Sequence, residues 1–209
     1  EIWVAEGVYY PDEGVTDNDR TATFSLLNNV KILGGFNGTE SSSADRKPAQ
    51  YETILSGDID GNDTNDDGNH IAENITHIKG TNSRHVVSSL NVDNTAVLDG
   101  FTITAGNAKG SGTLVSNPDN LGGGIINLGD EANAELSAPT FSQLKIIGNR
   151  ARIYGGGMAN MNAAPTITDS EFTANGAPSA PNDNGSGGAI YNKNSSFTIA
   201  NSSFIDNQA

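Results

Sequence analysis

Residues 155–177 read GGGMANMNAAPTITDSEFTANGA and residues 187–209 read GGAIYNKNSSFTIANSSFIDNQA. The two stretches are each 23 residues long and align without a gap, so that Phe172 matches Phe204. A third copy at 122–151 fits once an insertion of about seven residues is allowed. Because self-similarity at a fixed period marks repeat architectures, the chain is expected to stack copies of one unit.

Apolar and polar residues alternate within short segments of each copy, as in Thr166-Ile167-Thr168. A period of two favours β-strands, and no stretch of helical length carries apolar residues at i, i+3, i+4 and i+7. A unit of a few short strands cannot bury its apolar face alone, so neighbouring copies must pack on one another. Each unit would form one coil, and successive coils would lie ~4.8 Å apart. We therefore predict an all-β fold, a parallel β-helix.

Asparagine recurs at two positions of each copy, and paired glycines precede the first of them. Stacked amide side chains can donate and accept hydrogen bonds along the stack, and glycine suits a corner too tight for a Cβ atom. We therefore predict two structural ladders, one formed by Asn127, Asn160 and Asn192 and the other by Asn149, Asn175 and Asn207.

The alternation of Gly-Gly-[Ala/Gly]-[Ile/Met] with Phe-x-x-Asn resembles the polymorphic outer membrane protein repeats first recognised in chlamydial surface proteins. The first motif occurs at 122–125, 155–158 and 187–190; the second occurs at 172–175 and 204–207, with the aliphatic variant Ile-Ile-Gly-Asn at 146–149. The upstream stretches 2–10, 34–40 and 98–104 are similar to the front end of large bacterial right-handed β-helix surface proteins. This resemblance implies a right-handed, single-stranded, pectate-lyase-like solenoid. It implies no particular activity, because that scaffold hosts both adhesins and sugar-cleaving enzymes.

The chain is expected to form one solenoid over 1–209 with about eight or nine coils of ~20–25 residues. Its irregular N-terminal coils cover 1–121 and contain an acidic loop at 57–70, and three strict repeats cover 122–209. Since no polar cap follows the last repeat, we expect a fragment of a longer polypeptide. Strands upstream of the repeats are expected at Ile2–Tyr10, Thr23–Leu27, Val30–Phe36, Thr53–Leu55, Ile71–Ile78, His85–Leu90, Ala96–Leu98 and Phe101–Thr104.

The composition excludes several classes of protein. The formal net charge is −14, with 11 Lys and Arg against 25 Asp and Glu, and so acidic a chain repels nucleic acid. The sequence contains no run of 18 apolar residues that could cross a membrane, and the absence of cysteine excludes disulfides and thiolate sites.

The strongest chemical signal is the acidic loop at 57–70. Its stretch Asp63-x-Asn65-x-Asp67-Gly68 matches positions 1, 3, 5 and 6 of an EF-hand calcium loop, but position 12 is Asn74 instead of glutamate. A looser calcium site and a simple solvated acidic loop therefore both stay open. The candidate ligands are Asp58, Asp60, Asp63, Asn65 and Asp67.

Signals for catalysis are weaker, and we assign no catalytic residue. The three histidines, His70, His77 and His85, lack the spacing of a zinc site. A calcium-dependent lyase would need a base such as Arg84 or Lys79 near Asp93 or Asp99, and a glycoside hydrolase would need paired carboxylates in one groove. Aromatic side chains that could stack on sugars or lie in the core are Trp3, Tyr9, Tyr10, Tyr51, Tyr154 and Tyr191.

We expect an extracellular or outer-membrane-surface segment that acts as an adhesin or ligand-binding scaffold, possessing no transmembrane segment of its own. Its partner would be an extracellular ligand, a host or neighbouring-cell surface, or a polysaccharide. Loops at Lys109–Asn120 and Pro178–Ser186 would be displayed at fixed spacing on the rod. The alternatives are a carbohydrate-active enzyme, such as a calcium-dependent polysaccharide lyase or glycoside hydrolase, and a passive stalk.

Overall fold

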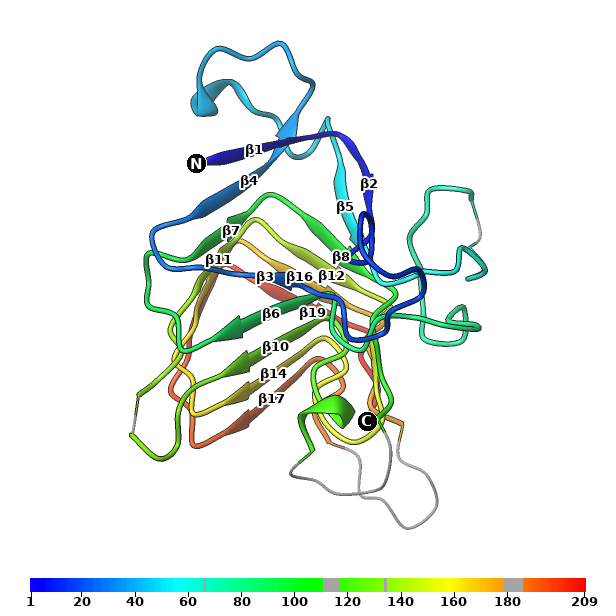
Figure 1. Ribbon diagram of the computed structural model, residues 1–209, viewed down its shortest axis with the longest axis vertical. Coiled ribbons are helices and arrows are strands. Elements are labelled where there is room, and N and C mark those ends of the chain that lie inside the picture. Colours follow the sequence, from blue (N-terminus) through cyan, green and yellow to red (C-terminus); the bar gives the residue numbers. More distant parts are fainter. Residues whose placement is uncertain (66, 111–116, 134, 179–185) are drawn as a thin grey trace.

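The structure is a computed structural model that describes residues 1–65, 67–110, 117–133, 135–178 and 186–209. It is a parallel β-helix built from three long parallel sheets, which Figure 1 shows as stacked layers of strands. Sheet 1 consists of β1 (Ile2–Ala5), β4 (Lys31–Phe36), β7 (Val97–Asp99), β11 (Thr140–Ser142), β15 (Thr166–Thr168) and β18 (Thr198–Ala200). Sheet 2 consists of β2 (Gly7–Tyr9), β5 (Thr53–Ser56), β8 (Thr102–Thr104), β12 (Lys145–Ile147), β16 (Glu171–Thr173) and β19 (Ser203–Ile205).

Sheet 3 consists of β3 (Phe24–Ser25), β6 (Val87–Leu90), β10 (Ile125–Leu128), β14 (Met158–Met161) and β17 (Ile190–Lys193). A small fourth sheet pairs β9 (Asn107–Ala108) with β13 (Arg150–Ala151), and two short 3₁₀ turns are η1 (Ser43–Asp45) and η2 (Pro118–Asn120). The chain passes through sheets 1, 2 and 3 in that order in each coil.

The stack holds five complete coils and the first two strands of a sixth, because sheets 1 and 2 have six strands each and sheet 3 has five. This is fewer than the eight or nine coils expected. The expectation divided the length by an average coil, but long connections such as 37–52 and 57–86 leave the stack and lengthen the N-terminal coils.

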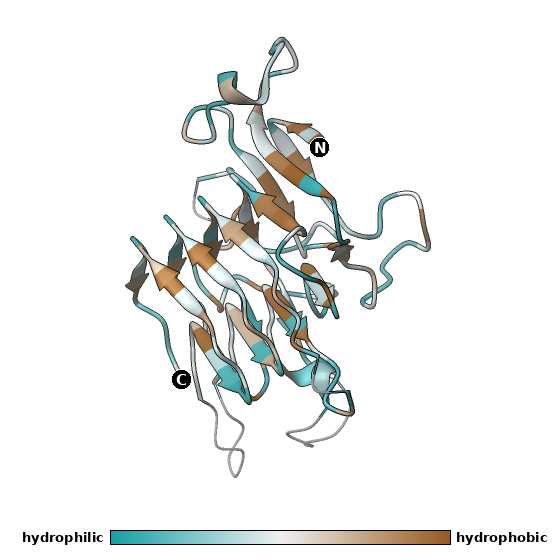
Figure 2. Ribbon diagram, turned by 90° about the vertical axis from the view of Figure 1, so that its left-hand side faces the viewer, coloured by the Kyte–Doolittle hydropathy of each residue, from teal (hydrophilic) through white to brown (hydrophobic). Residues whose placement is uncertain are grey.

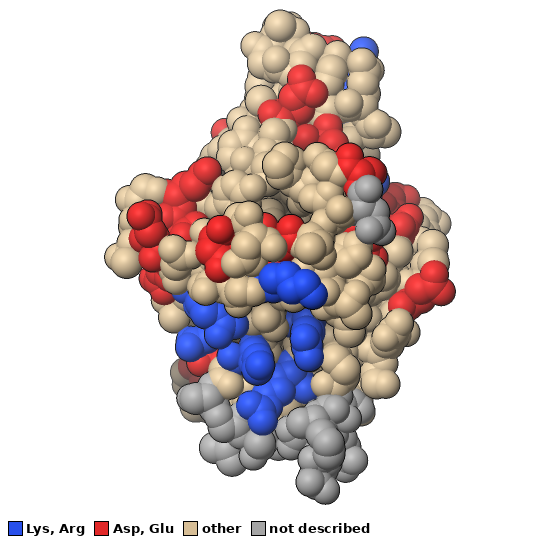
Figure 3. Space-filling model, turned by 90° about the vertical axis from the view of Figure 1, so that its right-hand side faces the viewer, with Lys and Arg blue, Asp and Glu red and all other residues tan. Residues whose placement is uncertain are grey.

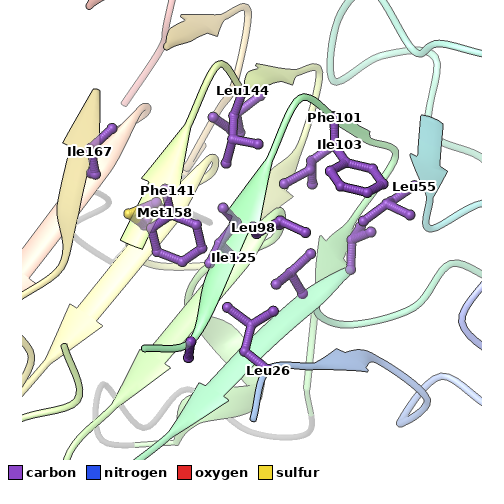
Figure 4. Packing of buried hydrophobic residues seen from close by; sticks show 14 of the residues in the cluster. Leu26, Leu55, Leu98, Phe101, Ile103, Ile125, Phe141, Leu144, Met158 and Ile167 are labelled. Atoms are coloured by element: carbon purple, nitrogen blue, oxygen red, sulfur yellow. The ribbon is translucent and has the colours of Figure 1, made fainter. Parts of the chain in front are cut away.

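The core fills the space enclosed by the three sheets. Each sheet turns one apolar side chain per strand inward, and registered pairs such as Leu98 with Phe141, and Ile103 with Ile146, stack coil upon coil. Figure 4 shows these side chains pointing toward one another from successive strands, and Figure 2 shows the apolar segments recurring along the stack. In β12 the buried Ile146 lies between the exposed Lys145 and the half-exposed Ile147, which is the period of two that the sequence displays.

The register follows the sequence repeat. Phe172 pairs with Phe204, as the alignment of the two gapless copies predicts. Asparagine side chains then join the coils. Asn127 Nδ2 donates to Asn160 Oδ1 at 2.6 Å and Asn160 Nδ2 donates to Asn192 Oδ1 at 2.7 Å.

A second ladder runs through the other asparagine position. Asn149 Nδ2 donates to Asn175 Oδ1 at 3.0 Å, and Asn175 Nδ2 donates to Asn207 Oδ1 at 2.9 Å. The glycines before the first ladder turn a tight corner. Gly155 has φ +66°, and a Cβ atom there would lie 2.2 Å from the carbonyl oxygen of Met158.

The expected strand Ile71–Ile78 is wrong. These residues belong to the connection 57–86 and form bends and turns. Asn74 Oδ1 accepts a hydrogen bond from the Thr76 backbone N–H at 2.9 Å, a local turn that competes with strand pairing. Ile71 and Ile78 are nevertheless buried. The apolar residues that suggested a strand are therefore the buried residues of a loop.

Candidate functional site

Most of the long connections leave the stack at one corner, although 37–52 leaves it between sheets 1 and 2. In every complete coil the longest connection runs from sheet 2 to sheet 3, as at 10–23 and 57–86. Figure 1 shows these two loops on the right-hand side of the stack. We call this edge the loop-bearing corner. The predicted display loops Lys109–Asn120 and Pro178–Ser186 also lie between sheets 2 and 3, but their residues 111–116 and 179–185 lie outside the described residues.

The acidic loop occupies the upper part of this corner and is held by its own carboxylates. Asp58 accepts hydrogen bonds from the backbone N–H groups of Asn62 and Asp63 at 3.1 and 3.2 Å. Asp60 accepts from the Thr81 backbone at 2.7 Å. Asp63 accepts from the Lys79 backbone at 2.5 Å and from an Asn82 side chain at 2.7 Å; these bonds tie the two halves of the connection together.

Burial and mutual repulsion raise the pKa values of two of these carboxyl groups. Burial raises the pKa of Asp63 to about 6, and the nearby charge of Asp58 adds to this rise despite the opposing hydrogen bond from Lys79. Burial also raises the pKa of Asp58, which lies beside Asp60. Burial and the charge of Asp58 raise the pKa of Tyr10 in the same place. The acids therefore lie close enough to interact and are partly shielded from water.

The structure brings some of the candidate calcium ligands together. Asp58, Asp63 and Asn65 line one pocket of about 300 Å³ together with Tyr10, and Oδ1 of Asp60 is buried without a hydrogen-bond partner among the described residues. Asp67 is exposed and accepts from the Asn69 backbone at 3.1 Å.

The donor set is of the hard oxygen type that calcium prefers. However, within the described ranges no three His, Cys, Asp or Glu side chains are grouped so as to hold a metal ion. Calcium binding by Asp58, Asp60, Asp63, Asn65 and Asp67 therefore stays a prediction.

A basic patch lies beside the acidic loop. Figure 3 shows Lys and Arg side chains gathered in one area of the face that is the right-hand side of Figure 1, with acidic side chains around it. Backbone contacts bring five basic residues together on this side, and we call them the arginine patch: Arg20, Arg84, Lys109, Arg150 and Arg152.

Backbone contacts place these residues together. The Arg84 N–H donates to the carbonyl of Arg20 at 2.9 Å. The Arg20 guanidinium in turn donates to the carbonyls of Asn107 at 2.9 Å and Lys109 at 3.2 Å. Arg150 of β13 pairs with Asn107 of β9. Burial lowers the pKa of Arg20, and the nearby positive charge of Arg84 lowers it further. The two guanidinium groups therefore lie close enough to interact.

A shallow groove crosses sheet 2 on another side of the stack. It has a volume of about 410 Å³ and its lining comes from five successive coils, including Glu52, Thr102, Lys145, Glu171 and Ser203. Lys145 Nζ lies 3.0 Å from Glu52 Oε1, which also accepts a hydrogen bond from Thr102 at 2.9 Å. Glu171 of β16 pairs with Lys145 of β12. Lys145 therefore lies between Glu52 and Glu171 along the groove.

Among the residues considered for a lyase, Lys79 lies beside the acidic loop, because its backbone N–H donates to Asp63. Arg84 is ion-paired with Asp119 at 3.0 Å, and Asp99 is ion-paired with Arg46 at 2.7 Å. Asp93 accepts a hydrogen bond from the Thr95 backbone at 2.9 Å, in the connection between sheets 3 and 1. Asp93 therefore lies on a different connection from the acidic loop, and Asp99 lies in β7.

The histidines and aromatic residues have structural contacts. His77 Nδ1 lies 2.7 Å from Glu73, and His85 is half-buried with Nδ1 2.9 Å from the carbonyl of Gly122. Burial lowers the pKa of His85. Trp3 stacks on Phe36 with ring centroids 5.0 Å apart. The other aromatic contacts are the Tyr154–Tyr191 stack at 4.3 Å and the hydrogen bond from Tyr9 to the carbonyl of Ala5 at 3.2 Å.

The fold and its loop-bearing corner define the class of protein as a parallel β-helix solenoid. Comparisons of the chain with protein-family models, curated proteins and solved structures found no match. Among the described residues, no helix is long and apolar enough to span a membrane.

Proposed function

We propose that this chain is an extracellular or cell-surface β-helix segment that binds a ligand with its loop-bearing corner, as an adhesin or scaffold does. One observation carries the proposal. In every complete coil the longest connection leaves the stack between sheets 2 and 3. Loops held by a rigid scaffold are where binding residues concentrate, and strand pairing between successive coils keeps this scaffold rigid.

Site-directed blocking tests this proposal, because the chain has no cysteine of its own. A single cysteine introduced at Asp17, which is exposed in the loop 10–23, can carry a bulky polyethylene glycol. The matched control introduces it at Glu131, an exposed acid in the connection between sheets 3 and 1. Binding to a panel of polysaccharides and intact cells should fall for the label at 17 and persist for the label at 131. Equal effects of the two labels contradict the proposal, and an absence of any ligand favours the passive stalk.

The groove on sheet 2 supports a second candidate, a glycoside hydrolase. Glu52 and Glu171 line one groove, and paired-carboxylate hydrolysis uses two acids that flank the substrate in one groove. Release of reducing ends from a polysaccharide panel, abolished in Glu171→Gln but not in the exposed-acid variant Asp17→Asn, would favour it. We expect no β-elimination of polygalacturonate, since Arg84 is ion-paired with Asp119; unsaturated products lost in Arg84→Ala would contradict this.

A further inference from the structure

The arginine patch is a concentration of charge opposite in sign to the rest of the molecule. The chain has a formal net charge of −14, yet four of its five arginines lie in this patch, together with Lys109. The four arginines come from three segments far apart in sequence, around residues 20, 84 and 150, which the coils bring side by side. Charges of one sign repel, so their collection on one face of an acidic protein favours a function for that face.

The fold sets the spacing of the patch. Along 150–154 the side chains alternate, with Ala151 and Ile153 buried and Arg150, Arg152 and Tyr154 directed outward. Within this stretch Arg150 and Ala151 are extended, in β13, and a bend follows at Arg152 and Ile153. Neighbouring coils are ~4.8 Å apart, and the pairing of β13 with β9 places Arg150 beside the segment that leads to Lys109. The patch is thus a group of cations on a short strand and on turns whose backbones are joined across the coils.

Backbone contacts fix the position of one arginine of the patch without neutralising it. The guanidinium of Arg20 donates to three backbone carbonyls. Arg84 is paired with Asp119 at 3.0 Å. Arg84 Nε and Asn107 Oδ1 are buried without a hydrogen-bond partner in the part of the chain that the structure describes. Because buried polar atoms are nearly always satisfied in folded proteins, we expect ordered water to satisfy this donor and this acceptor.

An aromatic pair adjoins the cations. Tyr154 follows Arg152 by two residues and packs against a buried apolar cluster that includes Leu121, and its ring stacks on Tyr191 with centroids 4.3 Å apart. Both tyrosines are half-exposed. Guanidinium forks match carboxylate and sulfate groups, while an aromatic ring offers a flat apolar surface to the C–H face of a sugar.

We propose that the arginine patch binds an acidic polysaccharide, with guanidinium groups on its carboxylate or sulfate groups and Tyr154 against a sugar ring. This inference rests on the proposed function of the loop-bearing corner and names its ligand. A polysaccharide with one charge on each acidic sugar fits better than duplex nucleic acid, which carries a charge every ≈1.7 Å. The denser charge of the duplex meets stronger repulsion from the rest of this acidic protein.

Binding to immobilised polysaccharides tests the inference. The full chain is passed over polygalacturonate, which presents carboxylates, over dextran sulfate, which presents sulfates, and over neutral dextran. Wild type should bind one or both acidic polymers, and added NaCl should weaken the binding. Lys109→Gln/Arg150→Gln should lower the affinity about tenfold, since each lost exposed contact contributes a few-fold. The control Lys31→Gln/Lys193→Gln removes the same charge from exposed positions elsewhere and should change affinity less than about twofold.

Three outcomes overturn the inference. The first is no binding of wild type to either acidic polymer. The second is an equal loss in the patch and control variants, which would indicate diffuse attraction. The third is tighter binding of a single-stranded poly(dT) oligonucleotide, which would assign the patch to nucleic acid. If wild type instead binds neutral polysaccharides or cells with unchanged affinity in the patch variant, the proposed function stands and this inference fails. Circular dichroism and the thermal midpoint verify that each variant is folded.

Discussion

The rings of Phe172 and Phe204 stack in successive coils with centroids 5.1 Å apart and planes within 11°, yet Phe172 is fully buried and half of Phe204 is exposed. The difference arises from their places in sheet 2. Phe172 has Ile146 on one side and Phe204 on the other, whereas β19, which carries Phe204, is the edge strand. Identical positions of the repeat therefore contribute differently to stability.

Truncation of the two rings should reveal this difference. Phe172→Ala should lower the free energy of unfolding by about 3–5 kcal/mol because it leaves a cavity between coils. Phe204→Ala should cost roughly 1–2 kcal/mol, since a half-exposed ring buries less apolar area. Urea unfolding followed by circular dichroism measures both values. Equal costs would show that the edge coil is covered in solution.

The first asparagine ladder should show the same dependence on position. Asn160 is fully buried, accepts from Asn127 and donates to Asn192. Asn160→Ala should therefore cost about 2–4 kcal/mol, because it leaves the Asn127 amide buried without its acceptor. Asn192 is exposed, and Asn192→Ala should cost less than about 1 kcal/mol because water replaces the lost bond. Hydrogen exchange of β10 and β14 should quicken in the first variant alone; similar exchange in both would contradict this assignment.

The sequence predicts the fold best where its repeat is strict. Over 122–209 the alignment places Phe172 on Phe204 and Asn160 on Asn192, and the strands pair in that register. A single apolar position per strand is enough to predict the register, because a slip by one residue would turn it outward. Upstream, the coils vary in length. Apolar residues such as Ile71 and Ile78 are buried within a loop. Their spacing in the sequence alone does not distinguish such a loop from a strand.

The candidate site is harder to predict from the sequence. The acidic loop is contiguous in the chain, so the sequence reveals it, whereas the arginine patch joins segments that are far apart in the sequence. Arg84 by itself resembles any basic residue on a solvated face. The one local signal is Arg150-Ala-Arg-Ile-Tyr154, in which two cations and an aromatic residue alternate with buried apolar residues. Its meaning depends on Arg20 and Lys109, which only the stacking of coils brings near.

Asp63 should make stability depend on pH. Its pKa is raised to about 6 in the folded chain, from an ordinary value of 3.8, mainly by burial. Between these values the folded state holds a proton that the unfolded state has released. Stability therefore falls as pH rises from 4 to 6 and levels off above 6. Because the group is partly exposed, solvent screening reduces the expected loss to roughly 1 kcal/mol.

The unfolding midpoint measured from pH 4 to 7 in wild type and Asp63→Asn tests this dependence. The variant should lose most of this fall, even though its amide weakens the bond to Asn82 and lowers stability at every pH. The control Asp17→Asn removes an exposed acid from the neighbouring loop and should keep the wild-type slope. The same slope in all three proteins would rule out Asp63 as its source.

Calcium should stabilise the acidic loop, and protons should compete with it. Asp58, Asp63 and Asn65 share one pocket, and a divalent cation there would offset the repulsion that raises the pKa values of Asp58 and Asp63. Without a glutamate at position 12 we expect weak affinity, with Kd on the order of 10⁻⁴–10⁻³ M. Ten millimolar calcium at a Kd of about 1 mM would then add about 1.4 kcal/mol to the free energy of unfolding.

The gain in stability from calcium should be present at pH 7 and shrink below pH 6, where Asp63 is protonated. Asp63→Ala/Asp67→Ala should abolish it, whereas Asp93→Ala/Glu131→Ala, which removes two exposed acids from connections between sheets 3 and 1, should retain it. Thermal unfolding in calcium, magnesium or chelator measures each case, and a midpoint that chelation leaves unchanged would show that the hydrogen bonds from Asn62, Lys79 and Thr81 hold the loop without an ion.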